Sequence, residues 1–417
     1  MVAKQIIKSD YRQTEIGIIP EDWDVDEIQN HANITTGAKN TQDRIEDGRF
    51  PFFVRSQKVE RINTYSYDGE AILTAGDGVG TGKVFHYIND KFDFHQRVYS
   101  ISDFDNRLDG YFFYLYFSSH FLARIMSMTA KSSVDSVRRD MIAKMFIPLP
   151  KKNEQLAIVT AMRDIIELIE TLDKSIEKKK NIKQGTMQEL LTGKRRSSER
   201  KTDYKQTEIG MIPEDWEIKK VGNFVDIKNG YAFKGEFFTD KPNENIVLTP
   251  VNFNIGGGFK TEKFKYTIEM YADEYILKDG DIIVTMTDLS KDGDTLGYPA
   301  KIPCKTRKKF LHNQRLGLLT FKSKISKNFI YWVLRTKRYH IFVIGSATGS
   351  TVKHTSPDRI KQHLFALPLD YSEQEQIATV LSNMDSEIEE LEKNKNKYIM
   401  IKNGMMQKLL TGEIRLK

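Results

Sequence analysis

The side chains in this sequence that are best suited to a chemical task lie in two sets of polar loops. Residues 35–40 and 53–58 form one set, and residues 228–233, with Lys234 after them, and 249–254 form the other. Loops rich in arginine, lysine, asparagine, glutamine and serine supply the hydrogen bonds that read base edges and phosphates. We therefore predict base contacts from these loop residues: Lys39, Asn40, Arg55, Gln57 and Lys58 in the first set, and Tyr231, Lys234, Asn252 and Asn254 in the second.

A second polar motif occurs at comparable places in the two halves of the chain. It reads His-Gln-Arg at residues 95–97 and His-Asn-Gln-Arg at residues 312–315. Because a recurring motif cannot by itself encode two different base sequences, we assign Arg97 and Arg315 to fold support or phosphate contact. The interpretation that these polar residues only tie a buried turn together stays open.

The glycine-rich segment at residues 76–83 resembles a phosphate-binding loop but does not match its pattern. The Walker pattern requires glycine five residues before Gly82 and Ser or Thr after the lysine, yet Asp77 and Val84 stand there. The segment is therefore interpreted as a turn between strands, from which Lys83 could contact a phosphate.

Two further segments, residues 129–136 and 346–354, are small, hydroxylated and basic. Such loops favour close approach to a phosphate backbone, although solvated loops share this composition. The candidate phosphate contacts in them are Lys131, Ser132, Thr348, Ser350 and Lys353.

Composition argues against metal binding and gives no sign of catalysis. The single cysteine, Cys304, allows neither a disulfide framework nor a cysteine zinc site, and no histidine has metal-ligand spacing to another. Lys and Arg number 64 against 57 Asp and Glu, and the net charge of +7 mildly favours a polyanionic partner. Because no run approaches the ~18 apolar residues of a membrane span and the polar start lacks a signal-peptide core, we expect a soluble cytoplasmic protein without a membrane partner.

The chain contains two copies of one unit. Residues 10–23 return as residues 203–216 with nearly the same sequence, a shift of 193. Glu-Gln at 154–155 and Leu-Leu-Thr-Gly at 190–193 return at 373–374 and 409–412, a shift of 219. Trp23 and Trp216 in the first repeated phrase are interpreted as core anchors, with stacking against a base as the alternative.

Each copy combines short strands with one helix and ends in an apolar strand with proline. Strands are expected at residues 71–74, 97–101, 146–150 and 364–368, and helices at 111–128 and 329–343. The predicted domains are 1–150 and 196–368, each followed by a helical segment, 151–195 and 369–417. The basic cluster at 178–180 and 194–196 is interpreted as a solvated face, with contact to DNA or an acidic subunit as the alternative.

A long amphipathic helix follows each domain. Its apolar residues alternate in steps of three and four, which is typical of a coiled-coil seam. A helix over 154–191 would be ~55 Å long, and an antiparallel pairing of the two helices would place the domains at opposite ends of a rod. The predicted seam residues are Ile158, Met162, Ile165, Ile169, Leu172 and Ile176 in one helix, and Ile377, Leu381, Met384, Ile388 and Leu391 in the other.

The ordered set of motifs resembles the specificity subunit of type I restriction-modification systems. It comprises the twin Ile-Pro-x-x-Trp openings, the Glu-Gln helix starts and the Leu-Leu-Thr-Gly helix ends, and it covers the whole chain. The resemblance implies an α+β fold of two similar α/β target recognition domains joined by two long antiparallel coiled-coil helices. Each domain would bind one half of a split DNA sequence.

The resemblance also implies partners in a prokaryotic cytoplasm. The helices would set the gap between the DNA halves and dock two modification subunits, which restriction subunits join. Methyl transfer, ATP-driven translocation and cleavage, with S-adenosylmethionine, ATP and Mg²⁺, would then belong to those partners, and this chain would be non-catalytic. A two-headed protein-binding scaffold remains the alternative. A single-chain nuclease or methyltransferase would need a metal-carboxylate cluster or an adenine-pocket motif, and neither is present.

Overall fold

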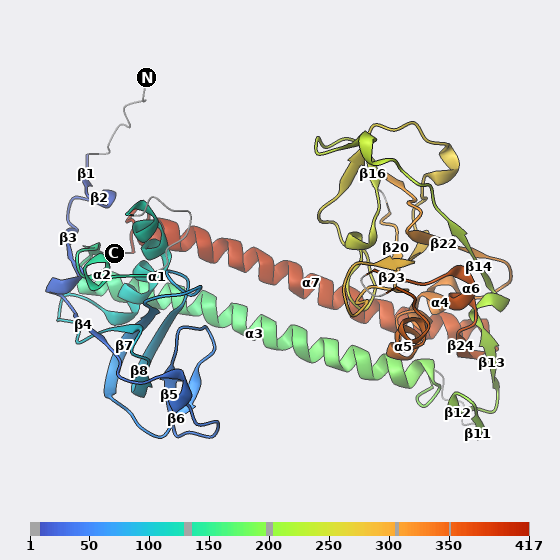
Figure 1. The fold of residues 1–417 in the computed structure, drawn as a ribbon, viewed down its shortest axis with the longest axis horizontal. Coiled ribbons are helices and arrows are strands. Elements are labelled where there is room, and N and C mark those ends of the chain that lie inside the picture. Colours follow the sequence, from blue (N-terminus) through green and yellow to red (C-terminus); the bar gives the residue numbers. More distant parts are fainter. Residues whose placement is uncertain (1–8, 129–135, 197–202, 305–307, 350–351, 417) are drawn as a thin grey trace. The chain divides into compact units, whose positions relative to one another are not determined.

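The computed structural model describes residues 9–128, 136–196, 203–304, 308–349 and 352–416 (Figure 1). The chain forms two compact units, one of residues 1–174 with 392–417 and the other of residues 175–391. Each unit holds one copy of the repeated α/β domain, which we call its head, together with part of each long helix. The predicted α+β class with two similar domains is confirmed.

The first head is built on a six-stranded sheet in the order β4-β9-β7-β8-β5-β6. Neighbouring strands are antiparallel, except that β5 and β8 run parallel. The strands are β4 (Asn33–Thr36), β5 (Phe50–Phe53), β6 (Glu60–Ile62), β7 (Tyr67–Ala75), β8 (Phe85–Phe94) and β9 (Val98–Ser102). Two ribbons complete the head, β1 (Tyr11–Thr14) with β2 (Gly17–Pro20) and β3 (Asp24–Glu27) with β10 (Phe146–Leu149).

Helix α1 (Gly110–Ser127) packs its aromatic residues on this sheet. Asp109 caps its first turn, since the carboxylate accepts hydrogen bonds of 3.0 Å from the backbone N–H groups of Tyr111 and Phe112. Phe117 and Phe121 are fully buried, and both meet the ring of Phe85 on β8 edge to face. A short helix, α2 (Arg139–Ala143), precedes β10.

The second head has the same kinds of elements but two four-stranded sheets, β14-β22-β18-β20 and β15-β17-β16-β21. Where the first head has the single strand β8, the second has the separate strands β20 and β21, and the sheet is divided there. The strands are β14 (Val225–Asn229), β15 (Phe238–Thr239), β16 (Asn245–Val247), β17 (Lys265–Thr267), β18 (Ile282–Thr285), β20 (Pro299–Lys301), β21 (Lys309–Leu311) and β22 (Leu316–Phe321). Three ribbons accompany them: β11 (Tyr204–Thr207) with β12 (Gly210–Pro213), β13 (Trp216–Lys220) with β24 (Leu364–Pro368), and β19 (Thr287–Asp288) with β23 (Lys353–His354).

The prediction of a single helix over 329–343 is wrong, because two helices occupy this region. They are α4 (Lys327–Val333) and α5 (Lys337–Gly345), and a shorter helix, α6 (Pro357–Lys361), follows. Thr336 separates α4 from α5, since its hydroxyl accepts a hydrogen bond of 3.2 Å from the backbone N–H of Tyr339 and so starts a new helix.

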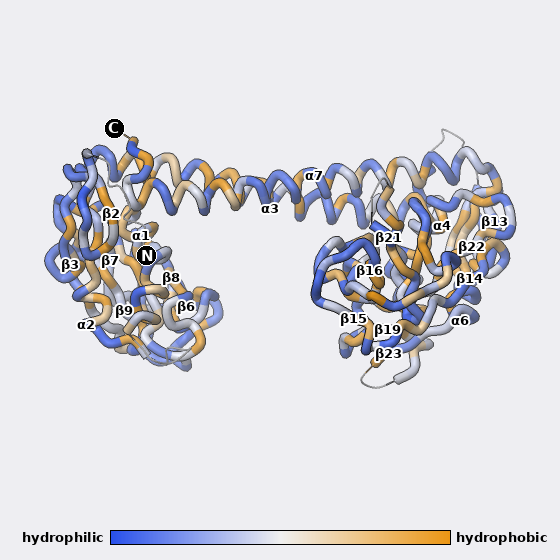
Figure 2. The backbone as a smooth tube through the Cα atoms, turned by 90° about the horizontal axis from the view of Figure 1, so that it is seen from above, coloured by the Kyte–Doolittle hydropathy of each residue, from blue (hydrophilic) through white to orange (hydrophobic). Residues whose placement is uncertain are grey.

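The two long helices are α3 (Lys152–Leu191) and α7 (Tyr371–Leu409). In the first unit the start of α3, with Ile158 and Met162, shares a core with the end of α7 at Leu409. In the second unit the start of α7, with Ile377, shares a core with the end of α3 at Leu190. The pairing is therefore antiparallel within each unit, and hydrophobic and hydrophilic bands alternate along both helices (Figure 2).

The burial of the seam residues agrees with the heptad prediction, since none is exposed. Ile169, Leu172, Met384 and Leu391 are half-buried. The buried members are Ile158, Met162, Ile165, Ile176, Ile377, Leu381 and Ile388.

The repeated motifs meet where a long helix ends. In the first unit, Gly412 follows α7 with a positive φ of 70° and lies against Pro20 and Trp23. A Cβ there would come within 2.5 Å of the proline ring, so only glycine fits both the backbone and the contact. Gly193 makes the same contact with Pro213 in the second unit. Trp23 and Trp216 are both 0% exposed, and the prediction that they anchor the cores is confirmed.

Candidate nucleic-acid interface

Asp77 organises the polar surface of the first head. Its carboxylate accepts a hydrogen bond of 2.7 Å from Nη1 of Arg55 and another from Nη1 of Arg97. Burial disfavours the charged form of Asp77, but the hydrogen bonds and charges of Arg55 and Arg97 outweigh it and lower the pKa of this carboxyl below its usual value. Two predicted residues, one from the polar loops and one from the recurring motif, are thereby brought together.

Lys39 and Asn40 lie on the same surface, beside Gln96. The backbone N–H of Gln96 donates to the carbonyl of Lys39 at 2.8 Å, and its side-chain amide donates to Oδ1 of Asn40 at 2.6 Å. Asn40 also begins a 3₁₀ turn, Thr41–Asp43. The loop at 35–40 is therefore fastened to the recurring motif.

The recurring motif has a structural role in the first head, as the interpretation of a tied buried turn expects. His95 is 5% exposed, and its Nδ1 accepts a hydrogen bond of 3.0 Å from the backbone N–H of Arg97. Burial, followed by the nearby charge of Arg55, lowers the pKa of His95, so the ring is neutral and can accept. A buried tie therefore holds the backbone of Arg97 while its guanidinium stays 61% exposed.

The second head repeats this arrangement, although the place of His95 is held not by the histidine of its motif, His312, but by the residue after it. Asn313 takes the place of His95, since its Oδ1 accepts from the backbone N–H of Arg315 at 3.0 Å. The backbone N–H of Gln314 donates to the carbonyl of Tyr231 at 2.9 Å, as Gln96 does to Lys39. Tyr231 therefore takes the place of Lys39.

No acidic residue among the described part of the second head pairs with Arg315. Its guanidinium is exposed and pairs with no side chain of the described residues, whereas Arg97 bonds to Asp77. Around Tyr231 the second head instead has Glu269, which accepts a hydrogen bond of 3.2 Å from the tyrosine hydroxyl and another of 2.9 Å from the backbone N–H of Lys234. The recurring arginines thus share a backbone setting and differ in their acidic neighbours.

The remaining predicted residues are spread over the two heads. Gln57, Lys83, Lys234, Asn254 and Thr348 are exposed, and Lys353 is half-buried. Lys58 is exposed and forms an ion pair of 3.3 Å with Glu60. The backbone of Thr348 pairs with that of His354 next to β23. Three predicted residues, Lys131, Ser132 and Ser350, lie outside the described residues.

The prediction for Asn252 has to be revised. Asn252 is 0% exposed, and its side chain caps a turn by accepting from the backbone N–H of Thr249 at 3.1 Å and donating to the carbonyl of Glu262 at 3.0 Å. Because its amide is used inside the protein, Asn252 supports the loop and does not face a ligand.

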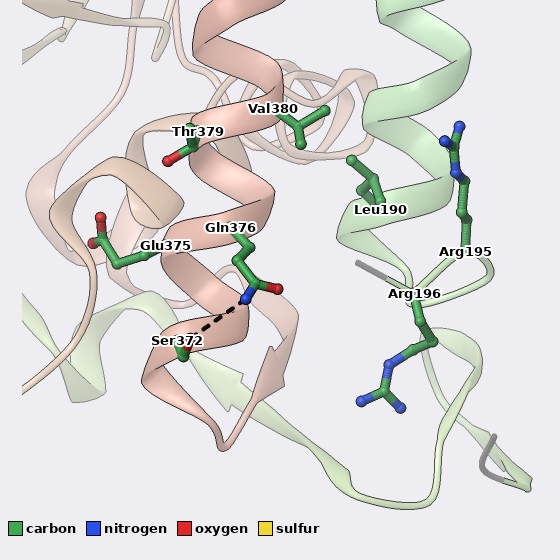
Figure 3. A pocket seen from close by; sticks show the side chains of 8 residues that line it. All are labelled: Leu190, Arg195, Arg196, Ser372, Glu375, Gln376, Thr379 and Val380. Carbon is green, nitrogen blue, oxygen red and sulfur yellow. Dashed lines mark hydrogen bonds between the residues drawn. The ribbon is translucent and has the colours of Figure 1, made fainter. Parts of the chain in front are cut away.

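The solvated-face interpretation of the basic cluster also fails for one residue. The side chain of Arg196 is only 7% exposed, and it donates to both carboxylate oxygens of Glu373 at 2.7 and 2.8 Å and to those of Asp215 at 2.8 and 2.9 Å. Its neighbour Arg195 is exposed and lines an open pocket between the end of α3 and the start of α7 (Figure 3). Arg195 and Arg196 point to different sides there.

Sequence reasoning missed the carboxylates of these sites. Asp77 was considered only as a departure from a nucleotide loop, and Glu269 was not singled out. A glycine on either side of Asp77 was the available signal, because Gly-Asp-Gly places a carboxylate on a tight turn. Among the described residues, no group of three or more His, Cys, Asp and Glu side chains is arranged to hold a metal ion, and no helix is long and apolar enough to cross a membrane.

Comparison with known proteins identifies the family. The model of the type I restriction modification DNA specificity domain matches residues 20–183 and again residues 213–400. Two specificity subunits of Methanocaldococcus jannaschii are similar over nearly their full length. The MjaVIII type I restriction enzyme subunit is 28% identical, covering 96% of this chain and 94% of the relative, and the putative MjaX subunit is 27% identical, covering 98% of each.

Solved structures share the fold. The S subunit of a type I restriction-modification system from M. genitalium aligns with a TM-score of 0.62 at 15% identity, covering 93% of this chain and 96% of that one. A chain from a structure concerning assembly and conformational transition of the type I R-M system aligns with a TM-score of 0.53 at 10% identity, covering 95% and 99%. This chain belongs to the type I restriction-modification DNA specificity family, and it is a non-catalytic DNA-recognition subunit.

Proposed function

We propose that each head binds one half of a bipartite DNA target through the surface that contains its recurring arginine. In the first head this surface comprises Lys39, Asn40, Arg55, Arg97 and Gln96. In the second head the corresponding residues are Tyr231, Gln314 and Arg315. The recurring arginines contact phosphates, and the diverged residues around them select the bases.

One observation carries this proposal: the same backbone arrangement presents an arginine in both heads while the neighbouring side chains differ. Lys39 and Tyr231 occupy equivalent places but offer a cation and an aromatic ring. A binding module that reads two different half-sites needs a shared means of positioning and a variable means of reading. The two heads provide both.

The long helices have a second proposed role. They set the spacing between the two DNA halves and dock two modification subunits, which restriction subunits join in a prokaryotic cytoplasm. The exposed faces of α3 and α7 support this, since Ile182 and Ile401, which are 219 positions apart, are 49% and 40% exposed. S-adenosylmethionine, ATP and Mg²⁺ belong to those partner subunits in this proposal, and this chain supplies no cofactor site.

Methylome sequencing of a host that carries this chain with its modification subunit tests the proposal. We expect adenine modification at one asymmetric, two-part motif. Exchanging residues 1–150 for another first head should change one part only. Modification at an undivided motif, or changes in both parts after the exchange, would contradict the proposal.

A salt titration separates DNA recognition from the two-headed protein scaffold. Affinity for the target duplex should fall steeply as salt rises, because bound cations displace counterions from the phosphates. Replacing Arg55 should cost about 1–3 kcal/mol and relax one position of the first half-site alone. Uniform weakening on every sequence would instead make Arg55 a phosphate contact.

A further inference from the structure

Val79 is 99% exposed at the apex of the segment between β7 and β8. Its loop is packed, not merely extended into solvent. Gly78 has a positive φ of 78°, and a Cβ on Gly80 would come within 2.5 Å of the carbonyl oxygen of Arg55. The hydroxyl of Thr81 closes the turn on the carbonyl of Gly78 at 2.7 Å. The fold therefore holds an aliphatic side chain in solvent beside the Arg55–Asp77–Arg97 cluster.

The second head presents an aliphatic side chain at the equivalent place. The backbone N–H of Gly76 donates to the carbonyl of Arg97 at 2.8 Å, and that of Met286 donates to the carbonyl of Arg315 at 2.9 Å. Gly76 and Met286 are therefore equivalent. Three residues after each stands an exposed aliphatic residue, Val79 in one head and Leu289, 62% exposed, in the other.

The loop that carries Leu289 is also held from inside. Asp288 is 5% exposed, and its carboxylate accepts hydrogen bonds of 2.7 Å from the backbone N–H of Ser290 and from the hydroxyl of Thr295. In the first head the carboxylate of Asp77 has the corresponding task and bonds to two arginines. The loops differ in sequence and in how they are fixed, yet both keep an aliphatic residue in solvent.

A single exposed aliphatic residue is ordinary on a protein surface. An exposed aliphatic residue at the equivalent position of both heads is less ordinary, because the loop residues around that position differ between the heads. Proteins that deform duplex DNA insert apolar side chains between neighbouring base pairs, while cations beside them hold the phosphates. Val79 with Arg97, and Leu289 with Arg315, offer these two components together.

We propose that Val79 and Leu289 are apolar wedges that enter the DNA groove and pack into one base step of each half-site. The inference rests on the proposed function, since it requires that the surfaces around Arg97 and Arg315 face DNA. The arginines fix the register on the backbone, and the wedge partly unstacks the bases next to it. Duplex DNA is the occupant, and a protein partner at these loops is the competing outcome.

The test uses the full chain and the target duplex, with 2-aminopurine placed at successive positions of each half-site. Binding should raise the fluorescence at one step in each half, because unstacking relieves quenching. Val79→Ala should abolish the rise in the first half-site only, and Leu289→Ala in the second only. Val79→Ala removes two carbons from a buried contact and Leu289→Ala removes three, so binding should weaken on the order of ten- to fifty-fold. The salt dependence should not change, since neither side chain is charged.

Matched variants make the result specific. Ile341 on α5 is 59% exposed, close to the 62% of Leu289, and Ile45 in the first head is 44% exposed. Ile341→Ala and Ile45→Ala should leave both the fluorescence and the affinity unchanged. Wild-type binding that is salt-dependent but silent in fluorescence, or variants that bind like these controls, would overturn the wedge and leave the proposed function standing. A wild-type chain without salt-dependent duplex binding would end both.

Discussion

Arg415 donates two hydrogen bonds to the carboxylate of Glu154, from Nε to Oε1 at 2.6 Å and from Nη2 to Oε2 at 2.8 Å, although 261 residues separate them. The same guanidinium bonds to Asp22 at 2.8 and 2.9 Å and lies over the ring of Trp23, with 5.5 Å to its centroid. The indole N–H of Trp23 donates in turn to Glu154 at 3.1 Å. The chain end after α7 is thereby joined to the first head and to the start of α3.

Arg196 repeats this cluster in the second unit, with Glu373, Asp215 and Trp216 in the same roles. The cluster explains which residues recur in the repeated motifs. The Asp of each Asp-Trp and the Glu of each Glu-Gln accept hydrogen bonds from the arginine, and the Trp provides the ring beneath it. The arginine itself stands three residues after the glycine of Leu-Leu-Thr-Gly. Each phrase is a component of one contact.

Removing one partner of this cluster should destabilise the unit that contains it. Glu154 has a side chain only 4% exposed, so Arg415→Met leaves a buried carboxylate without its charge partner. We expect a loss of about 2–4 kcal/mol in the free energy of unfolding of the first unit. Urea denaturation, together with hydrogen exchange of the Trp23 backbone amide, measures it. Arg195→Met is the control, because Arg195 is exposed and should change stability little. Equal effects of the two variants would contradict a structural role for Arg415.

Local patterns made the seam and the strands predictable, whereas partners distant in the sequence could not be foreseen. The heptad identified Ile158 and Leu381 as buried because helical periodicity is set by neighbours three and four residues away. Nothing in the sequence near Arg196 indicates that Glu373 neutralises it. The prediction for Asn252 failed for a related reason, since neighbouring residues in the sequence do not distinguish an exposed amide from one that caps a turn. The acidic residues that organise each interface share this difficulty.

Arg335 should control the loop at residues 254–258 in the second head. Its guanidinium donates to the carbonyls of Gly256 at 2.9 Å and Gly257 at 3.1 Å, and it also pairs with Asp385 on α7. A lysine can keep the charge but cannot make these bonds together. Arg335→Lys should therefore speed hydrogen exchange of the Gly257 and Gly258 amides and weaken recognition of the second half-site alone.

Arg338 provides the control for this variant. It lies three residues further along the chain, is exposed and bonds to the carbonyl of Ile209. Arg338→Lys should leave exchange in the 254–258 loop at the wild-type rate. Unchanged loop exchange in Arg335→Lys would show that the backbone turn holds without the guanidinium.

His363 should make the second unit sensitive to mild acid. It is 3% exposed, packs against the rings of Tyr339 and Phe342, and burial, followed by the charge of Arg338, lowers its pKa from 6.5 to about 4. Folding thus favours the neutral ring, so its stabilising contribution is complete above pH 6.5 and is lost as pH falls toward 4. We expect a loss of about 2 kcal/mol in unfolding free energy between pH 7.5 and pH 5.

Urea denaturation across this pH range measures the loss, and His363→Gln identifies its source. The variant has no titrating ring, so its stability should depend on pH more weakly than that of the wild type, whatever its absolute value. Parallel pH profiles of the two proteins would place the titrating group elsewhere.

Asp77 should restrain the first head from binding DNA without regard to sequence. Its carboxylate lies 18% exposed between Arg55 and Arg97 and offsets part of their charge. In Asp77→Asn both guanidiniums become available to phosphates, so non-specific affinity should rise and the slope of log affinity against log salt should steepen by about 1. Discrimination at the first half-site should fall, because Arg55 loses its fixed position. Asp68→Asn changes the net charge equally at an exposed pair with Lys91 in the same head. If Asp68→Asn steepens the salt slope as much as Asp77→Asn does, the net charge of the whole head governs binding and the position of Asp77 between the two arginines does not.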